Sequence, residues 1–349
     1  MLKVVRFFIY FSLSFSSLTI AQEVPPINVF SSEVYGAENQ NWAISQNKNK
    51  LIYIANNKGL LEYNGANWQL YPTPNETIMR SVKCFQDKIY TGFYMDFGFW
   101  EKNNFGVLEY TSILESSNIE MLEDEQIWEI CELDGWMIFK SLQRIYLYNL
   151  KNKTFRIINA SNNIIKLSKV ENRIYFQEFG KGVFVIENGV PKLVANQKAL
   201  KENKIVEIFL KKGKLFFITQ KKGFYYLEDN TLKKWNISSN NFLTSKVIYS
   251  AKQLKNGNII LGTISNGFIK INVEGELFYQ ITQGIGLSNN TVLSIFEDID
   301  KNIWLGLDNG INTINLKSPF KLYKKKNNFW GTIYASILYK NKLYIGTNQ

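Results

Sequence analysis

The stretch VLSIFEDIDKNIWLGLDNGINTIN, residues 292–315, contains three short apolar runs separated by polar turns. The runs are rich in Ile, Leu, Phe and Trp, and their shortness favours β-strands over helices. The turn between the second and third runs ends in Gly310, a residue type that tolerates the positive φ angles of tight turns. The stretch therefore predicts consecutive antiparallel strands.

The same arrangement recurs along the chain with a mean spacing of about 42 residues between Gly59 and Gly310. Four short strands in a unit of this length are typical of a propeller blade, whose two apolar faces must be covered by neighbouring blades. We therefore expect an all-β, seven-bladed β-propeller with four-stranded antiparallel blades, with eight blades in one ring as the alternative. The blades are expected at roughly 40–73, 78–113, 125–159, 164–196, 205–237, 246–282 and 291–325, with the severed start of a further blade at 332–349.

The first 21 residues have the pattern of a cleavable signal peptide. Lys3 and Arg6 precede an apolar run from Phe7 to Ile20, and small residues precede Gln22. We expect export, with residues 1–21 as the signal peptide, 22–331 as the propeller, and 332–349 as the start of another blade or of a second propeller.

The composition argues against several functional classes. Histidine is absent, which removes Ser-His-Asp and Cys-His catalytic arrangements and His-ligated zinc. The formal net charge is +11. This charge suits an acidic ligand, but the lysines are scattered and are also explained as solvated turns. Export argues against nucleic acid as a partner, and no cofactor is expected.

Two stretches carry a family resemblance. GLSNNTVLSIFEDIDKNIWLGLDNGI, at 286–311, resembles the two-component-regulator propeller repeat. The stretch from Asn39 to Val82, followed by KIYTGFYMDFGFW, is similar to the periplasmic sensors of regulators that carry a triple-tyrosine domain, a membrane helix and a LuxR-type or histidine-kinase output. This resemblance implies a sensory propeller for a nutrient such as an oligosaccharide, tethered to the inner membrane in a longer protein for which a dimer is one expected state.

Ligands of propellers usually bind on the face formed by the loops between the second and third strands and the links between blades. We expect Tyr94 and Phe97 to stack on a sugar ring, while Asp96 and Arg144 bind its hydroxyl groups. The alternative is inter-blade packing for the aromatic residues and solvated turns for the polar ones. Other residues expected on this face are Asn56, Asn57, Met95, Gln143, Glu178, Lys181, Asn266, Asp308 and Asn309.

Three further sets of residues have plain structural interpretations. Asp298, Asp300 and Asn302 resemble the start of a calcium loop, but later ligands are missing, so a turn between strands is favoured and no metal is expected. Cys84 and Cys131 are expected to be two buried thiols and not a disulfide. Core packing is expected for the tryptophans in strand runs, namely Trp42, Trp128, Trp136 and Trp304.

The favoured function is a ligand-binding sensor without chemistry on the ligand. A scaffold that binds another envelope protein is the second hypothesis, to be separated by pull-down. A propeller lyase or glycosidase that uses paired carboxylates or a Tyr base is the third, to be separated by polysaccharide degradation assays.

Overall fold

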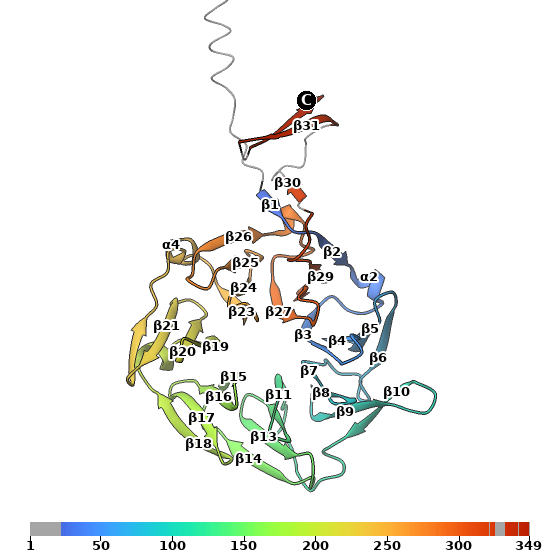
Figure 1. Cartoon of the computed structure of the whole chain (residues 1–349). Coiled ribbons are helices and arrows are strands. Elements are labelled where there is room, and N and C mark those ends of the chain that lie inside the picture. The colour runs from blue at the N-terminus through green and yellow to red at the C-terminus, as the bar shows by residue number, and fades with distance from the viewer. Residues whose placement is uncertain (1–21, 321, 325–331, 341, 349) are drawn as a thin grey trace, which may run out of the picture.

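The computed structural model describes residues 22–349 except residues 321, 325–331, 341 and 349. The expected signal peptide lies outside the described residues. Within the described ranges the structure is a closed seven-bladed β-propeller, so the predicted fold class is confirmed and the eight-bladed ring is not formed (Figure 1). The helices are single turns, and none in the described part of the chain has the length and apolarity to cross a bilayer.

Six blades are each built from four consecutive strands. The strands of the first three blades are β3 (Asn41–Gln46), β4 (Ile52–Asn56), β5 (Gly59–Tyr63) and β6 (Trp68–Pro72); β7 (Ser81–Phe85), β8 (Lys88–Phe93), β9 (Asp96–Lys102) and β10 (Leu108–Ser112); and β11 (Glu129–Leu133), β12 (Trp136–Lys140), β13 (Arg144–Asn149) and β14 (Phe155–Asn159). The next three blades are β15 (Ile164–Val170), β16 (Arg173–Glu178), β17 (Gly182–Glu187) and β18 (Val190–Ala195); β19 (Ile205–Lys211), β20 (Lys214–Thr219), β21 (Phe224–Glu228) and β22 (Thr231–Lys234); and β23 (Ile248–Gln253), β24 (Ile259–Thr263), β25 (Phe268–Ile271) and β26 (Leu277–Ile281).

The seventh blade joins the two ends of the chain. Its inner strands are β27 (Val292–Glu297), β28 (Ile303–Leu307) and β29 (Ile311–Ile314), and its outer strand is β2 (Ile27–Phe30) from the N-terminal region. Ile27 pairs with Ile314, and Phe30 pairs with Ile311. The expectation that residues up to 325 complete this blade is therefore wrong. The N-terminal strand β2 takes the place of the expected fourth strand and pairs with β29. This pairing covers the open edge of β29 and joins the two ends of the ring.

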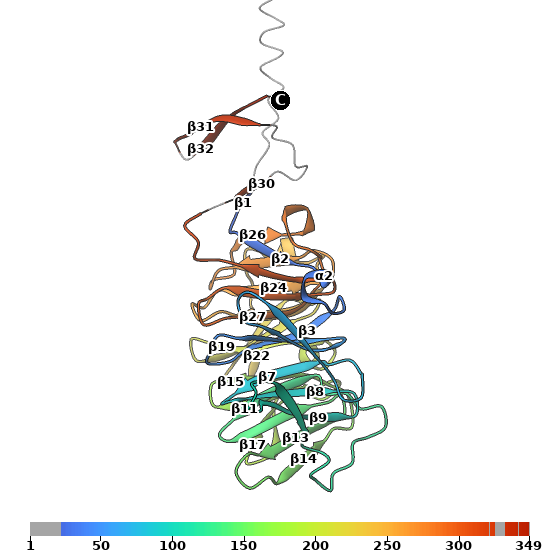
Figure 2. The same ribbon diagram turned by 90° about the vertical axis from the view of Figure 1, so that its right-hand side faces the viewer.

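Short helices and two small sheets complete the structure. The helices are α2 (Ser32–Tyr35), α3 (Lys198–Lys201), α4 (Asn240–Leu243) and the 3-10 turn η1 (Gln283–Ile285). Strand β1 (Gln22–Val24) pairs with β30 (Leu322–Lys324), and β31 (Ile333–Tyr339) forms a hairpin with β32 (Lys342–Thr347). This hairpin lies outside the ring (Figures 1 and 2).

Apolar clusters between blades hold the ring together. Among the described residues there are seven such clusters, and each one combines the facing sides of two neighbouring blades. The cluster that closes the ring packs Ile54 and Leu61 of the first blade against Trp304 and Ile311 of the seventh. Burial of each sheet face therefore requires both neighbours, which explains why the blades stack around an axis.

Small residues, glycine and serine, permit the closest approach between neighbouring blades. A Cβ atom on Gly306 would lie 2.3 Å from Ser294 Oγ and 2.4 Å from the carbonyl oxygen of Asn41 in the first blade. The Ser294 hydroxyl donates to that same carbonyl at 3.2 Å. Ser250 in the sixth blade donates to the carbonyl of Val292 at 2.8 Å in the same manner. A Ser–Gly pair thus fastens one blade to the next.

Candidate ligand-binding face

The strand order places the expected loops on one face of the ring. Asn41, at the start of β3, pairs with Asn56, at the end of β4, and Asn56 also pairs with Gly59, at the start of β5. The links between blades and the turns between second and third strands therefore share a face, as expected from the sequence. We call it the loop face.

Most of the predicted ligand-binding residues are engaged locally on this face. Tyr94 donates its hydroxyl to Asp124 at 2.5 Å. Asp96 accepts hydrogen bonds from Tyr110 and Ser112 at 3.0 and 2.7 Å, and burial raises its pKa. These contacts fix the second-blade loop, and Asp96 serves mainly to tie β9 to β10.

Phe97 is not available for stacking on a sugar. Its side chain is fully buried between the second and third blades, with ring centroids 4.4 Å from Phe139 and 5.2 Å from Tyr146. The expected role of Phe97 in ligand stacking is therefore wrong, and the inter-blade packing alternative is correct. The reason is that the aromatic ring lies on the side of β9 that faces the next blade.

The other predicted residues lie in separate places. Arg144 donates to the side chain of Asn159 at 3.0 Å and to the carbonyl of Glu120 at 3.0 Å, while Gln143 is exposed. Glu178 accepts hydrogen bonds from Ser161, Asn162 and Lys181. Burial raises the pKa of Glu178, but Lys181 and these N–H groups outweigh it, so the pKa lies below its usual value. Asp96 and Arg144 therefore both have local hydrogen-bond partners, and their contacts with the hydroxyl groups of a ligand stay a prediction.

Among the predicted residues, Asn57 is linked by a hydrogen bond to Trp42, one of the residues near the ring axis. Trp42 Nε1 donates to Asn57 Oδ1 at 2.7 Å, and Asn57 Nδ2 donates to Gln40 Oε1 at 3.0 Å. Gln40 Nε2 in turn donates to Asp308 Oδ1 of the seventh blade at 2.6 Å. This chain of hydrogen bonds connects the loops of two blades and orients the indole of Trp42.

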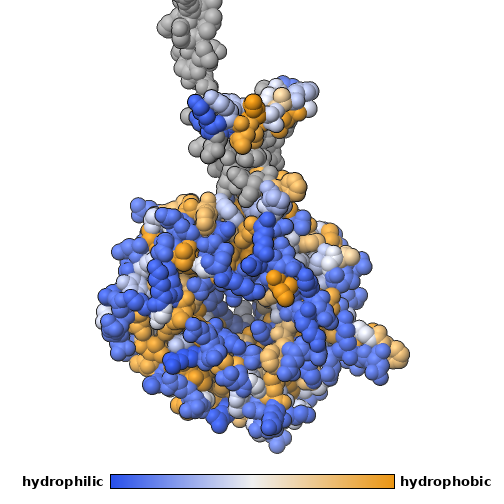
Figure 3. All heavy atoms as spheres, viewed as in Figure 1, coloured by the Kyte–Doolittle hydropathy of each residue, from blue (hydrophilic) through white to orange (hydrophobic). Residues whose placement is uncertain are grey.

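The start of each innermost strand holds one residue at an equivalent place in all seven blades, at the loop-face end of the strands that surround the ring axis, which we call the mouth. In five blades this residue is an extra residue in a β-bulge, which is a device that redirects a side chain. In the second and third blades the corresponding residue immediately precedes the innermost strand. Figure 3 shows the ring hollowed at its centre, with mainly hydrophilic residues around the hollow. The seven residues, in blade order, are Trp42, Arg80, Trp128, Ile165, Val206, Tyr249 and Leu293.

Three of these residues form an aromatic–cation group that we call the mouth cluster: Trp42, Arg80 and Trp128. The guanidinium carbon of Arg80 lies 3.9 Å from the ring centre of Trp42 and 4.7 Å from that of Trp128. The two indoles are perpendicular, with centroids 6.2 Å apart. Both tryptophans are half-buried and belong to none of the seven apolar clusters. Core packing, expected for these two residues, is therefore wrong, whereas Trp304 is buried in the core as expected.

The Arg80 guanidinium has unused hydrogen-bonding capacity. Its Nε donates to Gln126 Oε1 at 3.3 Å, but one terminal nitrogen is buried and has no hydrogen-bond partner among the residues that the structure describes. Burial lowers the pKa of Arg80, and interaction with Tyr249 of the sixth blade opposes this effect. Burial raises the pKa of Tyr249, because it disfavours the charged phenolate just as it disfavours the charged guanidinium. Tyr249 is 38% exposed. A buried donor without a partner is costly, so this nitrogen is a natural contact for a ligand oxygen.

Charged residues continue below the mouth cluster. Burial lowers the pKa of Lys83, and the positive charges of Lys169 and Lys252, from the fourth and sixth blades, lower it further. Between the third and fourth blades, Glu129 forms ion pairs with Lys166 at 2.8 Å and Lys140 at 3.6 Å. The innermost strands thus carry lysines together with paired carboxylates, and they do not form a second apolar core.

The remaining sequence expectations concern metals and cysteines. Asp298 accepts hydrogen bonds from Asn302 and from Trp304 Nε1, and Asp300 pairs with Lys50 at 2.9 Å. These carboxylates form a turn, and the described residues contain no cluster of three or more potential metal ligands. Both cysteines are free thiols, Cys84 packing against the cluster between the first two blades and Cys131 against the cluster between the third and fourth.

The fold and this face define a propeller with an aromatic–cation group at its mouth, and comparison with known proteins narrows the class. Residues 286–309 match the family model of the two component regulator propeller, which confirms the resemblance stated from the sequence. An 84-residue stretch is 34% identical to histidine kinase P4 of Formosa agariphila; it covers 23% of this chain and 6% of the kinase.

Solved structures share the fold at low sequence identity. The extracellular domain of a putative hybrid two component system of B. thetaiotaomicron superposes with a TM-score of 0.72 and 17% identity, over 93% of this chain and 47% of that domain. A putative one component system of the same organism gives a TM-score of 0.66 and 20% identity, over 84% of this chain and 40% of the other. A streptogramin B lyase superposes with a TM-score of 0.62 and 14% sequence identity, over 83% of this chain and 97% of the lyase. The chain spans less than half of the two extracellular domains.

Proposed function

We propose that this chain is the exported ligand-sensing propeller of a signal-transducing regulator, and that the mouth cluster binds the ligand. The observation that supports this proposal is the placement of Arg80 between Trp42 and Trp128, with one guanidinium nitrogen unpartnered. Aromatic faces and edges contact sugar rings, and a guanidinium donates to hydroxyl or carboxylate oxygens. The ligand is a nutrient, such as an oligosaccharide.

A ligand at the mouth would contact several blades at once. Trp42, Arg80 and Trp128 come from three consecutive blades, and Asp308 brings in the seventh through Gln40. The signal arises if the ligand has different affinities for two arrangements of the receptor, and this needs no chemistry on the ligand. We accordingly propose a receptor domain and not an enzyme.

The hairpin β31–β32 supports a longer receptor. In this hairpin the strand register shifts between Ile333 and Ala335, and Ala335 pairs with Gly346. The seventh blade has the same pattern, because its register shifts just before Ser294, which pairs with Gly306. The hairpin thus has the geometry of the first two strands of a blade, while the ring itself is already closed. We propose that residues 332–349 begin a second propeller. Triple-tyrosine, membrane and output domains would follow in a periplasmic, inner-membrane-tethered protein, and this region would bind no nucleic acid.

Thermal stability in the presence of a glycan panel tests the proposal. A ligand that binds only the folded state raises the melting temperature, and isothermal titration then gives its affinity. We expect Arg80→Gln to abolish the shift. The matched control is Arg156→Gln, which removes a guanidinium 5.6 Å from the ring of Trp136 at the opposite end of the blade.

Three results of this panel count against the proposal. A full panel without any shift would refute glycan binding. A shift that persists in Arg80→Gln would move the site away from the mouth cluster. Release of shortened glycans during the titration would show an enzyme instead of a sensor.

A further inference from the structure

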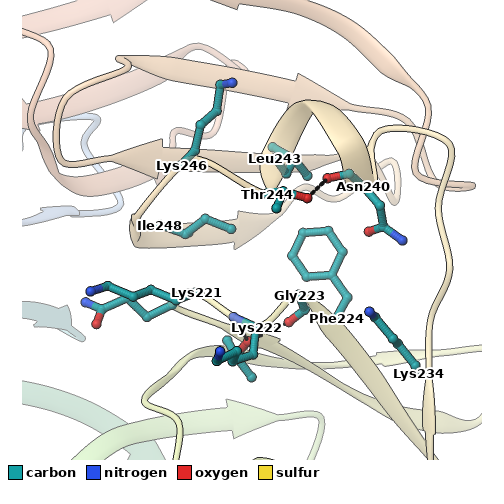
Figure 4. Close-up of a pocket in the computed structure, with 12 residues that line it drawn as sticks. Lys221, Lys222, Gly223, Phe224, Lys234, Asn240, Leu243, Thr244, Lys246 and Ile248 are labelled. Carbon is teal, nitrogen blue, oxygen red and sulfur yellow. Dashed lines mark hydrogen bonds between the residues drawn. The ribbon is translucent and has the colours of Figure 1, made fainter.

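A second cavity opens on the loop face between the fifth and sixth blades (Figure 4). Its volume is about 340 Å³, at the lower end of the range typical of small-molecule sites. The turn between β20 and β21 forms one wall, and α4 with the link into β23 forms the other. Ile248 lines the cavity, and the next residue, Tyr249, lies at the channel mouth. The cavity is therefore a separate site beside the mouth.

The local sequence holds both walls in place. Thr219 donates its hydroxyl to the carbonyl of Gly223 at 2.6 Å and accepts a hydrogen bond from the backbone N–H of Lys222 at 3.1 Å. Gly223 has φ +89°, a conformation that favours glycine at the end of this turn. The N–H of Ile248 donates to the carbonyl of Gln220 at 3.0 Å and joins the two walls.

The floor of the cavity is apolar. Phe224, Leu243 and Ile248 are 1%, 8% and 3% exposed, and all three belong to the cluster between the fifth and sixth blades. Such a floor contacts the body of a small ligand, whereas a free inorganic ion would leave it uncovered.

The rim of the cavity is cationic. Lys221, Lys222, Lys234 and Lys246 line it, and no Asp or Glu does. None of these four lysines forms an ion pair within the part of the chain that the structure describes, although many other lysines do. Figure 4 shows Lys234 extending toward Asn240, whereas Lys246 is directed away. Lys246 donates to the carbonyl of Phe242 at 2.5 Å. It therefore adds positive charge near the cavity but does not itself contact a ligand.

Like charges around one small cavity repel, and a bound anion relieves that repulsion. Lysine ammonium groups donate to carboxylate, sulfate or phosphate oxygens, and these charge-assisted hydrogen bonds are among the stronger ones. We propose that this cavity, lined by Lys221, Lys222 and Lys234 above Phe224, Leu243 and Ile248, binds a sugar-sized molecule that carries a carboxylate or sulfate group. The site is distinct from the mouth cluster, and it stands whether or not the mouth binds a glycan.

Titration of the chain with glucuronate and with glucose 6-sulfate tests the site, with glucose as the uncharged control and chloride holding the ionic strength constant. Both anions are expected to bind and glucose is not. Lys222→Gln and Lys234→Gln should each weaken binding about tenfold, because each removes a charge-assisted hydrogen bond. Lys58→Gln, at the equivalent position before Gly59 in the first blade, should leave it unchanged.

Several results would overturn the proposal. The proposed anion site would be refuted if both Lys222→Gln and Lys234→Gln bound the anions with unchanged affinity. It would also be refuted if glucose bound as tightly as glucuronate. Inorganic sulfate that binds as tightly as glucose 6-sulfate would refute the role of the apolar floor. Arg80→Gln should leave anion binding at this cavity intact, and this result separates failure here from failure at the mouth cluster.

Discussion

Replacement of Gly306 by alanine should destabilise the propeller at the junction where the ring closes. The added Cβ would lie 2.3 Å from Ser294 Oγ and 2.4 Å from the carbonyl oxygen of Asn41. The hydroxyl of Ser294 can rotate away, but the carbonyl belongs to the backbone of the neighbouring blade, so the two blades must separate. The expected effect is therefore larger than that of an ordinary strand substitution.

The magnitude follows from the lost contacts. Overpacking costs about 1–3 kcal/mol, and loss of the Ser294–Asn41 hydrogen bond adds about 1 kcal/mol. The lower backbone entropy of unfolded alanine compared with glycine offsets about 0.5–1 kcal/mol. We expect a net loss of about 1–3.5 kcal/mol in the free energy of unfolding, measured by urea denaturation with circular dichroism and tryptophan fluorescence.

Gly346 provides the matched control. It occupies the equivalent position in β32, opposite Ala335, but the nearest atoms to an added Cβ are 3.9 Å away. Gly346→Ala should leave the unfolding midpoint unchanged or raise it slightly. If Gly306→Ala unfolds at the same urea concentration as the parent chain, the close contact between the seventh and first blades is not what the structure describes.

Three further predictions concern buried groups. Burial raises the pKa of Glu129, but Lys166 and Lys140 outweigh burial and hold the pKa below its usual value. The stabilising contribution of Glu129 is therefore present above the pKa of the unfolded chain and is lost as the pH falls through the pKa of the folded one. Glu129→Gln should cost about 3–5 kcal/mol at neutral pH and flatten the acid limb of a stability–pH profile. Cys84 and Cys131 are half-buried, and burial raises the pKa of both thiols to about 12. At pH 8 a thiol reagent should therefore label both cysteines much more slowly in the native chain than in urea, and equal rates would contradict this environment. Phe97→Ala should cost about 3–5 kcal/mol, whereas Tyr94→Phe at the exposed end of the same loop should not shift the urea midpoint; equal effects would show that the loop is packed differently.

The blades were predictable because their signal is repeated. Apolar runs and loop glycines recur at nearly constant spacing, so a diverged unit such as the third, with Arg144 in place of glycine, is placed by its neighbours. The ring closure was not predictable in the same way. Strand β2 is only four residues long, and its partner β29 lies almost at the other end of the propeller, so no local pattern connects them.

The candidate sites were less predictable for a physical reason. Trp42 and Trp128 stand in β-rich runs where alternation suggests core packing, but a bulge or a strand start turns each toward the axis. Alignment of the repeats brings Trp42, Arg80 and Trp128 into one column, and this is the signal that identifies the mouth. Phe97 shows the converse error, because an unusual aromatic loop was interpreted as a binding surface although its ring faces the next blade.

The pairing of β2 with β29 also has a kinetic consequence. Strand β2 is synthesised before the six blades that separate it from β29, and its partner strand follows more than 280 residues later. Until β29 is made, β2 has no partner strand, and closing so long a loop is slow. A chaperone that shields Ile27–Phe30 during this interval would speed maturation.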